Sequence, residues 1–332
     1  MTTTLRKIFI FSIVVTICTG LPSKSHRGTH GHPIPPEPRN QGRFEDGHNH
    51  EEIDSHWYTL NIRLFYSFVR VARRINSWKP EDPENVWELS GLYQGDIMLP
   101  LNHKGSNRNG LLDTTTRWPN ATVPYYIEEE DFDRSDIEVI KDAIKEYHSR
   151  SCLRFRPYKE SDIDYVRIQG KSSGCWSMVG RHGKGQVLNL QVDGCVRHGV
   201  VVHELMHALG FYHQQSAANR DEWVVIHWDN IKPGKEHNFE KYDRDTVTDF
   251  GSSYDYSSVM HYSAHAFSAN GEATITPKVE DAKIGQRNGL SKIDVEKLQA
   301  MYKDECDNRE PEVSTASESE EDLSFNWSSL DL

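Results

Sequence analysis

This sequence contains, at positions 203–213, the stretch His203-Glu204-Leu205-Met206-His207-Ala208-Leu209-Gly210-Phe211-Tyr212-His213. On a helix, residues four positions apart point the same way, so the imidazoles of His203 and His207 can bind one metal ion. Glu204 then lies beside the ion, where its carboxylate can take a proton from metal-activated water. Gly210 accepts the left-handed backbone conformation that ends a helix, and the returning chain brings His213 to a third coordination position.

Three neutral nitrogens with an open fourth position are typical of catalytic zinc rather than structural zinc. Zinc lowers the pKa of a bound water to roughly 7, which supplies hydroxide near neutral pH. We therefore predict one Zn²⁺ per chain. The alternative is a helix with two surface histidines, and the extension to Gly210 and His213 weighs strongly against it.

A second segment, Ser258-Val259-Met260-His261-Tyr262, follows further along the chain. Met260 can form an apolar floor beneath the three histidines, and Tyr262 can present its phenol to the metal. Taken alone, both would be ordinary core residues. His261 has no predicted role beyond that of a packed or solvated histidine.

The first twenty residues are typical of a secretory signal peptide. Arg6 and Lys7 precede the apolar run 8–18, and small residues follow at 18–20. A membrane-spanning helix needs about 20 apolar residues, so this run is too short to be one. We expect a secreted, extracellular protein without a membrane span.

Of the five cysteines, Cys18 leaves with the signal peptide and four remain. An even number in an exported chain indicates two disulfides, and four cysteines allow three pairings. Cys175 and Cys195 bracket a short glycine-rich stretch, which suggests a local loop. Cys152 and Cys306 would then close a large ring.

The chain of 332 residues has a formal net charge of −12, with 50 acidic and 38 basic side chains. Because phosphate binding needs a basic surface, this balance argues against a nucleic-acid partner. Residues 307–332 hold eight acidic residues and one arginine, so the tail contributes −7 of the total. We interpret it as a disordered solubilising extension, with a docking segment as the alternative.

The remaining pattern predicts a low-complexity linker over 21–50, a helix over 57–78, a turn over 91–97 and a flexible stretch over 101–110. The globular part begins near Trp118. Ser135 and Glu138 form a capping-box pattern at the start of a helix whose apolar stripe continues to Tyr147. We expect strands at 122–127, 152–155, 165–168 and, as an exposed edge, 187–192, and helices at 200–209 and 291–302.

Together, the metal-binding stretch, the Met260 segment, the order of the cysteines and Tyr93-Gln94-Gly95-Asp96-Ile97 resemble the astacin family of metzincin zinc endopeptidases. The resemblance covers nearly everything from 92 to 306. It implies an α+β, two-lobed fold with a mixed-sheet N-terminal lobe, an irregular C-terminal lobe and zinc between them. It also implies the disulfides Cys152–Cys306 and Cys175–Cys195. The tyrosine matching Tyr262 would be a fifth zinc ligand at rest and would stabilise the oxyanion during turnover.

Residues 92–97 are similar to the switch in that family's pro-segment. The carboxylate of Asp96 would occupy the open zinc position and displace the water, and Gly95 would let the backbone approach closely. An activating protease would then remove the segment, with Arg108 as a candidate cleavage point and Asn109 as the new start. The resemblance thus implies a signal peptide at 1–20, a pro-segment at 21–108, a catalytic domain at 109–306 and a tail at 307–332.

The sequence departs from the family pattern after the third histidine. The family usually has Glu there, where it meets the buried new N-terminus, but this chain has Gln214. Gln214 can hydrogen-bond an amine but carries no charge. The segment 216–221 also lacks the family's first Arg and Asp, although Arg220 and Asp221 are present.

Two further features concern substrates and glycans. A strand at 187–192 could pair with an extended peptide by strand addition. Arg287 matches a family position that lines the pocket after the scissile bond, where a guanidinium favours Asp or Glu; a plain surface arginine is the alternative. Asn120 and Asn326 begin glycosylation sequons.

The sequence as a whole favours a latent zinc endopeptidase, a monomer acting on protein or peptide substrates. Two other classes stay open. A zinc-bound binding protein without turnover would typically lack Glu204 or one histidine, and here only Gln214 favours it. A disulfide-stapled matrix protein would have incidental histidines and no zinc.

Overall fold

The computed structural model describes residues 67–100, 113–243 and 248–309. The predictions for the signal peptide, the 21–50 linker, Arg108, Asn109, Asn326 and most of the acidic tail lie outside these residues. The described part of the predicted 57–78 segment is helical over 67–77.

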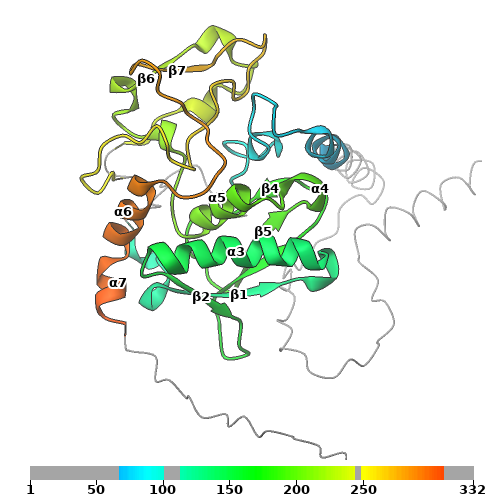
Figure 1. Cartoon of the computed structure of the whole chain (residues 1–332), viewed down its shortest axis with the longest axis vertical. Helices are drawn as coiled ribbons and strands as arrows, with labels where there is room; N and C mark the ends of the chain where they lie inside the picture. Colours follow the sequence, from blue (N-terminus) through cyan, green and yellow to red (C-terminus); the bar gives the residue numbers. More distant parts are fainter. Residues whose placement is uncertain (1–66, 101–112, 244–247, 310–332) are drawn as a thin grey trace, which may run out of the picture. The chain divides into compact units, whose positions relative to one another are not determined.

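A five-stranded mixed sheet forms the centre of the N-terminal half, with strand order β2-β1-β3-β5-β4 (Figure 1). The first four strands in this order run parallel, and β4 is antiparallel to β5. The bounds are β1 Thr122–Ile127, β2 Arg154–Pro157, β3 Tyr165–Gln169, β4 Cys175–Trp176 and β5 Gly185–Leu190. Parallel strands need covered faces, which explains why the strands carry many buried aliphatic side chains.

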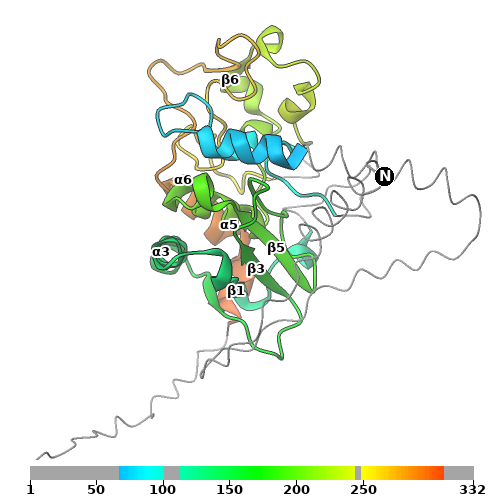
Figure 2. The ribbon, with the colours of Figure 1, turned by 90° about the vertical axis from the view of Figure 1, so that its right-hand side faces the viewer.

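Helix α3 (Arg134–Arg150) lies beside the sheet and contacts helix α5 (Figure 2). Its stripe of Ile140, Ile144 and Tyr147 is buried as predicted. The predicted capping box was wrong by two residues. The helix begins after Asp133, whose backbone is extended and whose side-chain carboxylate accepts from the Asp136 amide. Asp caps a helix at least as well as Ser, so the earlier residue takes this position.

Strands at 122–127 and 165–168 are confirmed, whereas the strand predicted at 152–155 begins at Arg154. The prediction of an exposed edge at 187–192 was wrong, because β5 lies between β3 and β4. The expectation of an edge came from the alternation of polar and apolar residues over 187–192, in which Asn189 would face solvent. Asn189 is buried, and its amide donates to the carbonyls of Lys171 and Gly174. The edge strands of this sheet are β4, next to β5, and β2 on the opposite side.

Helix α5 (His198–Ala208) carries the metal-binding stretch and is buried from Gly199 to Ala208. The turn that follows the helix is at Gly210, whose φ of +106° is a left-handed conformation, as the sequence predicts. A Cβ at this position would also lie 2.7 Å from the Met301 methyl group. The turn is what favours glycine here, because the flexible end of the Met301 side chain could move aside for a Cβ.

The C-terminal half is mostly irregular. It contains the antiparallel pair β6 (Val224–Ile226) and β7 (Ile275–Pro277), and it has its own small core around Phe239, Tyr262 and Phe267. Helices α6 (Lys292–Met301) and α7 (Lys303–Asp307) then return to the first core. Short helical turns complete the structure: α4 Val192–Cys195, η1 Trp87–Leu89, η2 Thr114–Thr116, η3 Pro119–Ala121, η4 Glu129–Asp131, η5 Gln214–Ser216, η6 Arg220–Glu222, η7 Trp228–Asn230 and η8 Glu236–Phe239.

Both implied disulfides are present, Cys152–Cys306 and Cys175–Cys195. The first joins the end of α3 to α7, so it closes the large ring suggested by the sequence. Among the described residues, no helix has the length and apolar character needed to cross a membrane.

Candidate metal centre

Three imidazoles converge at the end of α5. The ring centroids of His203 and His207 lie 4.8 Å apart, and that of His213 lies 4.7 Å from His207 and 5.3 Å from His203. The first two project from one face of the helix. The third arrives after the turn at Gly210, which makes the turn a condition for the site.

The carboxylate of Asp96 completes this group. Its oxygens lie 3.1 Å from Nε2 of His203, 3.5 Å from Nε2 of His207 and 3.3 Å from Nε2 of His213. All four side chains are completely buried. Burial opposes the charge of Asp96, but the facing histidines outweigh it and hold the pKa of this carboxyl well below its usual value.

The donor set fits a zinc ion. Two ligands at tetrahedral angles and about 2.0–2.1 Å from one ion lie roughly 3.3 Å apart, which is close to the 3.1–3.5 Å between the Asp96 oxygens and the three Nε2 atoms. The Nε2 atom of His207 and one oxygen of Asp96 are buried without a hydrogen-bond partner among the described residues. Buried polar atoms are rarely left unpaired, so these atoms are those expected of metal ligands.

The other ring nitrogen of each histidine faces an oxygen. Nδ1 of His203 lies 2.8 Å from the Val259 carbonyl, and Nδ1 of His207 lies 2.7 Å from the Phe211 carbonyl. Nδ1 of His213 lies 2.9 Å from the side-chain oxygen of Gln94. These acceptors favour the tautomer with the proton on Nδ1, which leaves every Nε2 lone pair free for a metal.

Glu204 is completely buried beside the histidines, and neither of its carboxylate oxygens has a hydrogen-bond partner among the described residues. Burial, and next the negative charge of Asp96, raise the pKa of this carboxyl well above its usual value. A carboxyl in this state within a closed site is poised to exchange a proton with a small molecule there.

Tyr262 lies against His213, with ring centroids 4.7 Å apart. Its phenol donates a 2.6 Å hydrogen bond to the backbone carbonyl of Gln94. The resemblance implied a phenol on the metal at rest. With residues 92–97 in place, the phenol is instead bonded to that segment.

Met260 is buried in the larger core, and its carbonyl accepts from the amide of Gln214. It lines the same cavity as His213. His261 is a packed histidine, with its ring nitrogens against the Tyr254 hydroxyl and the Tyr262 carbonyl. Packing is one of the two roles that the sequence analysis left open for it.

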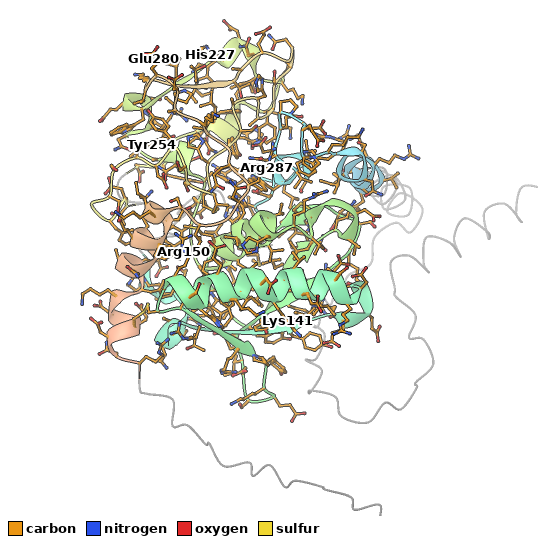
Figure 3. The ribbon with its side chains drawn as sticks, viewed as in Figure 1. Lys141, Arg150, His227, Tyr254, Glu280 and Arg287 are labelled. Carbon is orange, nitrogen blue, oxygen red and sulfur yellow. A yellow bond between two sulfur atoms is a disulfide. The ribbon has the colours of Figure 1, made fainter. Side chains whose placement is uncertain are left out.

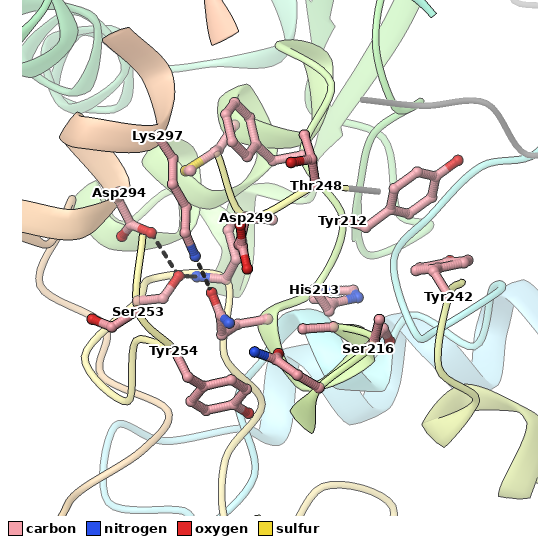
Figure 4. Close-up of a pocket in the computed structure, with 18 residues that line it drawn as sticks. Tyr212, His213, Ser216, Tyr242, Thr248, Asp249, Ser253, Tyr254, Asp294 and Lys297 are labelled. Carbon is pink, nitrogen blue, oxygen red and sulfur yellow. Dashed lines mark hydrogen bonds between the residues drawn. The ribbon is translucent and has the colours of Figure 1, made fainter. Parts of the chain in front are cut away.

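Gln214 faces a cavity of about 300 Å³, into which Lys297 of α6 points (Figure 4). The Lys297 ammonium donates a 2.6 Å hydrogen bond to the side-chain oxygen of Gln214. Burial lowers the pKa of Lys297, and the carboxylates of Asp294 and Asp255 partly oppose that effect. The uncharged Gln214 is thus already bonded to a cation of the same chain.

Arg287 is not a free surface arginine, because residues preceding the Asp96 turn surround it (Figure 3). Its guanidinium donates to the Asn85 side chain and to the carbonyls of Pro80, Asp82 and Glu84. It also lies 5.4 Å from the centre of the Trp78 ring.

Sequence reasoning missed two residues of the site. Trp87 stacks on His203, with ring centroids 4.2 Å apart and planes 17° from parallel. Gln94 contacts both His213 and Tyr262. Gln94 lies within the quoted 93–97 motif, which could have identified it, but an isolated tryptophan carries no such signal.

The fold and the site together define a class of metal-binding protein. In the described residues the three histidines of the site come from one helix and from the loop that follows it. Comparisons with known proteins agree. The model of the peptidase family described as "Astacin" matches residues 111–303. The chain is 42% identical to zinc metalloproteinase nas-13 of Caenorhabditis elegans over 200 residues, covering 60% of this chain and 43% of the relative.

Two other proteins are covered more completely. Seminal metalloprotease 1 of Drosophila melanogaster is 43% identical over 231 residues, which span 67% of this chain and 90% of that protein. High choriolytic enzyme 1, a hatching enzyme zinc-protease from the medaka fish Oryzias latipes, superposes with a TM-score of 0.54 at 36% identity. That match covers 57% of this chain and 96% of the solved structure.

The chain therefore belongs to the astacin family, a zinc-dependent family of metallopeptidases with the α+β fold that the sequence implied. It spans about half the length of several curated relatives, for example 43% of nas-13 and 52% of nas-15.

Proposed function

We propose that this protein is a secreted zinc endopeptidase that hydrolyses peptide bonds in proteins and is made as a latent precursor. The observation that supports this most is the convergence of three Nε2 atoms on the Asp96 carboxylate. Glu204 lies beside them without a hydrogen-bond partner among the described residues. His203, His207 and His213 would hold the zinc.

Zinc at this site supplies a Lewis acid that activates water and polarises the peptide carbonyl. Glu204 takes a proton from the attacking water and passes it to the nitrogen of the leaving amine. Tyr262, once free of Gln94, would stabilise the oxyanion of the tetrahedral intermediate by donating a hydrogen bond from its hydroxyl, which keeps its proton. Met260 supports the histidines from below.

Latency is supported by the position of residues 78–98, which lie across the three histidines and beside β4. Asp96 fills the place that water and substrate need. The backbone from Asp96 to Met98 pairs with Ser177, the residue after β4: the Ser177 amide donates to the Asp96 carbonyl, and the Met98 amide donates to the Ser177 carbonyl. The segment thus occupies the sheet edge to which an extended peptide substrate would add.

A preference for Asp or Glu after the scissile bond is supported by Arg287. In the precursor its guanidinium is engaged by oxygens of residues 80–85. Removal of residues 21–108 by an activating protease would free it for a substrate carboxylate.

The proposed organisation is a signal peptide at 1–20, the pro-segment at 21–108, the catalytic domain at 109–306 and an acidic tail at 307–332. We expect a monomer with glycans at Asn120 and Asn326. Asn120 is exposed, which a glycan requires. Because Lys297 already donates to Gln214, activation need not depend on a salt bridge from a new chain end to this position.

The test uses the full chain before and after controlled cleavage in 101–110. We expect about one zinc per chain in both forms, and hydrolysis of a quenched peptide by the cut form that a chelator abolishes and zinc restores. A cut, zinc-loaded protein that leaves every peptide intact would instead support a zinc-bound binding protein. A chain without zinc would support a matrix protein.

A further inference from the structure

The three histidines differ in which part of the chain holds them. The acceptors for Nδ1 of His203 and His207 are backbone carbonyls of Val259 and Phe211, which remain in the mature chain. The acceptor for Nδ1 of His213 is the side chain of Gln94, which lies in the proposed pro-segment. The third ligand therefore has a removable support.

We propose that Gln94 is a positioning residue of the precursor, which orients His213 for the metal and keeps Tyr262 away from it. This inference rests on the proposed function, in which zinc is bound and residues 21–108 are later removed. It gives the segment a second inhibitory contact, distinct from the carboxylate of Asp96.

All four polar groups of Gln94 are engaged. The side-chain oxygen accepts from His213, and the side-chain NH₂ donates to the Ser216 hydroxyl at 3.1 Å. The backbone amide donates to the Asn238 side chain at 2.9 Å, and the backbone carbonyl accepts from Tyr262 at 2.6 Å. Gln94 is completely buried, so none of these groups has water as an alternative partner.

The backbone makes this arrangement possible. Gln94 has a φ of +47° and Gly95 a φ of +96°, so the chain turns tightly at two left-handed residues. The turn directs the side chain of Gln94 to His213 while its carbonyl faces Tyr262. A non-glycine residue in this conformation is uncommon, and its backbone strain is offset by the four hydrogen bonds.

A fixed acceptor on Nδ1 holds the imidazole in one tautomer and one orientation and makes Nε2 a better ligand. Removing such a partner typically weakens metal binding about 10- to 100-fold. Asp96 and Gln94 thus act on different groups. Asp96 fills a coordination position, whereas Gln94 fixes a ligand and the phenol.

The experiment measures how fast the uncut full-length chain releases zinc to an excess of chromophoric chelator. Gln94→Leu removes the acceptor. Ser90→Ala is the matched control, because Ser90 lies in the same segment and bonds to the backbone of Cys175, not to a histidine. Gln94→Glu keeps an oxygen for Nδ1 and is the rescue variant.

We expect Gln94→Leu to release zinc roughly 10- to 100-fold faster than the wild type. Ser90→Ala should release it at nearly the wild-type rate, and Gln94→Glu should stay much closer to the wild type than Gln94→Leu. After cleavage and removal of the segment, all variants should release zinc at one common rate, because the altered residue is gone.

Equal release from Gln94→Leu and Ser90→Ala would overturn the inference. Near-ultraviolet circular dichroism of each chain reports folding, and Gln94→Met serves if Gln94→Leu does not fold. If Gln94→Leu and Gln94→Met both misfold while Ser90→Ala folds, Gln94 is needed for folding rather than for positioning His213. That result would also overturn the inference. An uncut wild-type chain that holds no zinc is a different result, which refutes the proposed function itself.

Discussion

The helix-borne part of the site and its loop-borne part are built in contrasting ways. His203, Glu204 and His207 lie on α5, which is buried in the larger core. His213 and Tyr262 lie on irregular chain, and their hydrogen-bond partners include Gln94. The helix thus provides a permanent frame, whereas the loops take part of their arrangement from a segment that maturation would remove.

Helix α6 links the loop-borne part to the helical frame. The Asp294 carboxylate accepts from the Ser258 hydroxyl and the Val259 amide, and the Val259 carbonyl in turn accepts from His203. Lys297, one turn along, donates to Gln214 beside His213. The contrast teaches that the helix holds three of the site residues through its own core, whereas the irregular chain places His213 and Tyr262 in contact with residues that the proposed activation would remove.

The largest expected effect tests the helix-borne part. Glu204→Gln in the cut chain should lower peptide hydrolysis by about 10²- to 10⁴-fold, because it removes the group that moves the proton. Zinc per chain should be unchanged, since the three histidines remain. Quenched-peptide kinetics and metal analysis measure both, and ordinary turnover by this variant would refute the role of Glu204.

The next prediction tests the removable segment. Asp96→Ala in the uncut chain should weaken the binding of residues 92–97 to the site by about 2–5 kcal/mol of free energy, because it breaks a buried charge-assisted contact. That energy corresponds to roughly 30- to 4,000-fold weaker binding of the segment to the site, so the uncut chain should become measurably active. Ser90→Ala is again the control, and a fully latent Asp96→Ala precursor would contradict the switch.

A third prediction concerns Arg287 in the irregular half. In the cut chain, Arg287→Ala should lower the preference for Asp or Glu after the scissile bond by about 1.5–3 kcal/mol, since a hydrogen bond to a charged group is lost. Comparing kcat/KM for matched peptides with Asp or Ala at that position measures the change. An unchanged ratio would refute the role of Arg287 in substrate preference and leave only its contacts with residues 80–85 of the uncut chain.

The last prediction concerns the pH dependence of the stability of the uncut chain. Glu88, within the segment, accepts hydrogen bonds from the Ser263 amide and hydroxyl and from the Asn85 amide. Burial nevertheless dominates and raises the pKa of Glu88 from its usual 4.5 to about 8. The folded chain therefore binds this proton more tightly than the unfolded chain, so stability falls as pH rises from about 4.5 to about 8.

The melting temperature of the uncut chain, measured across this pH range, tests the point. Glu88→Gln should flatten the profile, whereas Glu138→Gln, at an exposed position on α3, should leave it as in the wild type. Identical profiles for the wild type and Glu88→Gln would show that the carboxyl is ionised in the folded precursor.

The sequence by itself determined the features that depend on spacing. The 203–213 stretch predicts a helix, a glycine turn and three converging imidazoles, because helical periodicity and the left-handed turn are local properties. The cysteine positions suggested the two disulfides that the structure contains. The position of Asp96 came instead from the family resemblance of residues 93–97, and the structure groups its carboxylate with the three histidines.

Only the tertiary structure decided which partners meet across the chain. Asn189 is buried rather than solvent-facing because distant loop carbonyls accept from its amide. Trp87 on His203, Gln94 on His213 and Lys297 on Gln214 join residues far apart in sequence. Such contacts leave no periodic signal, because they depend on how packed elements approach one another rather than on local backbone preference.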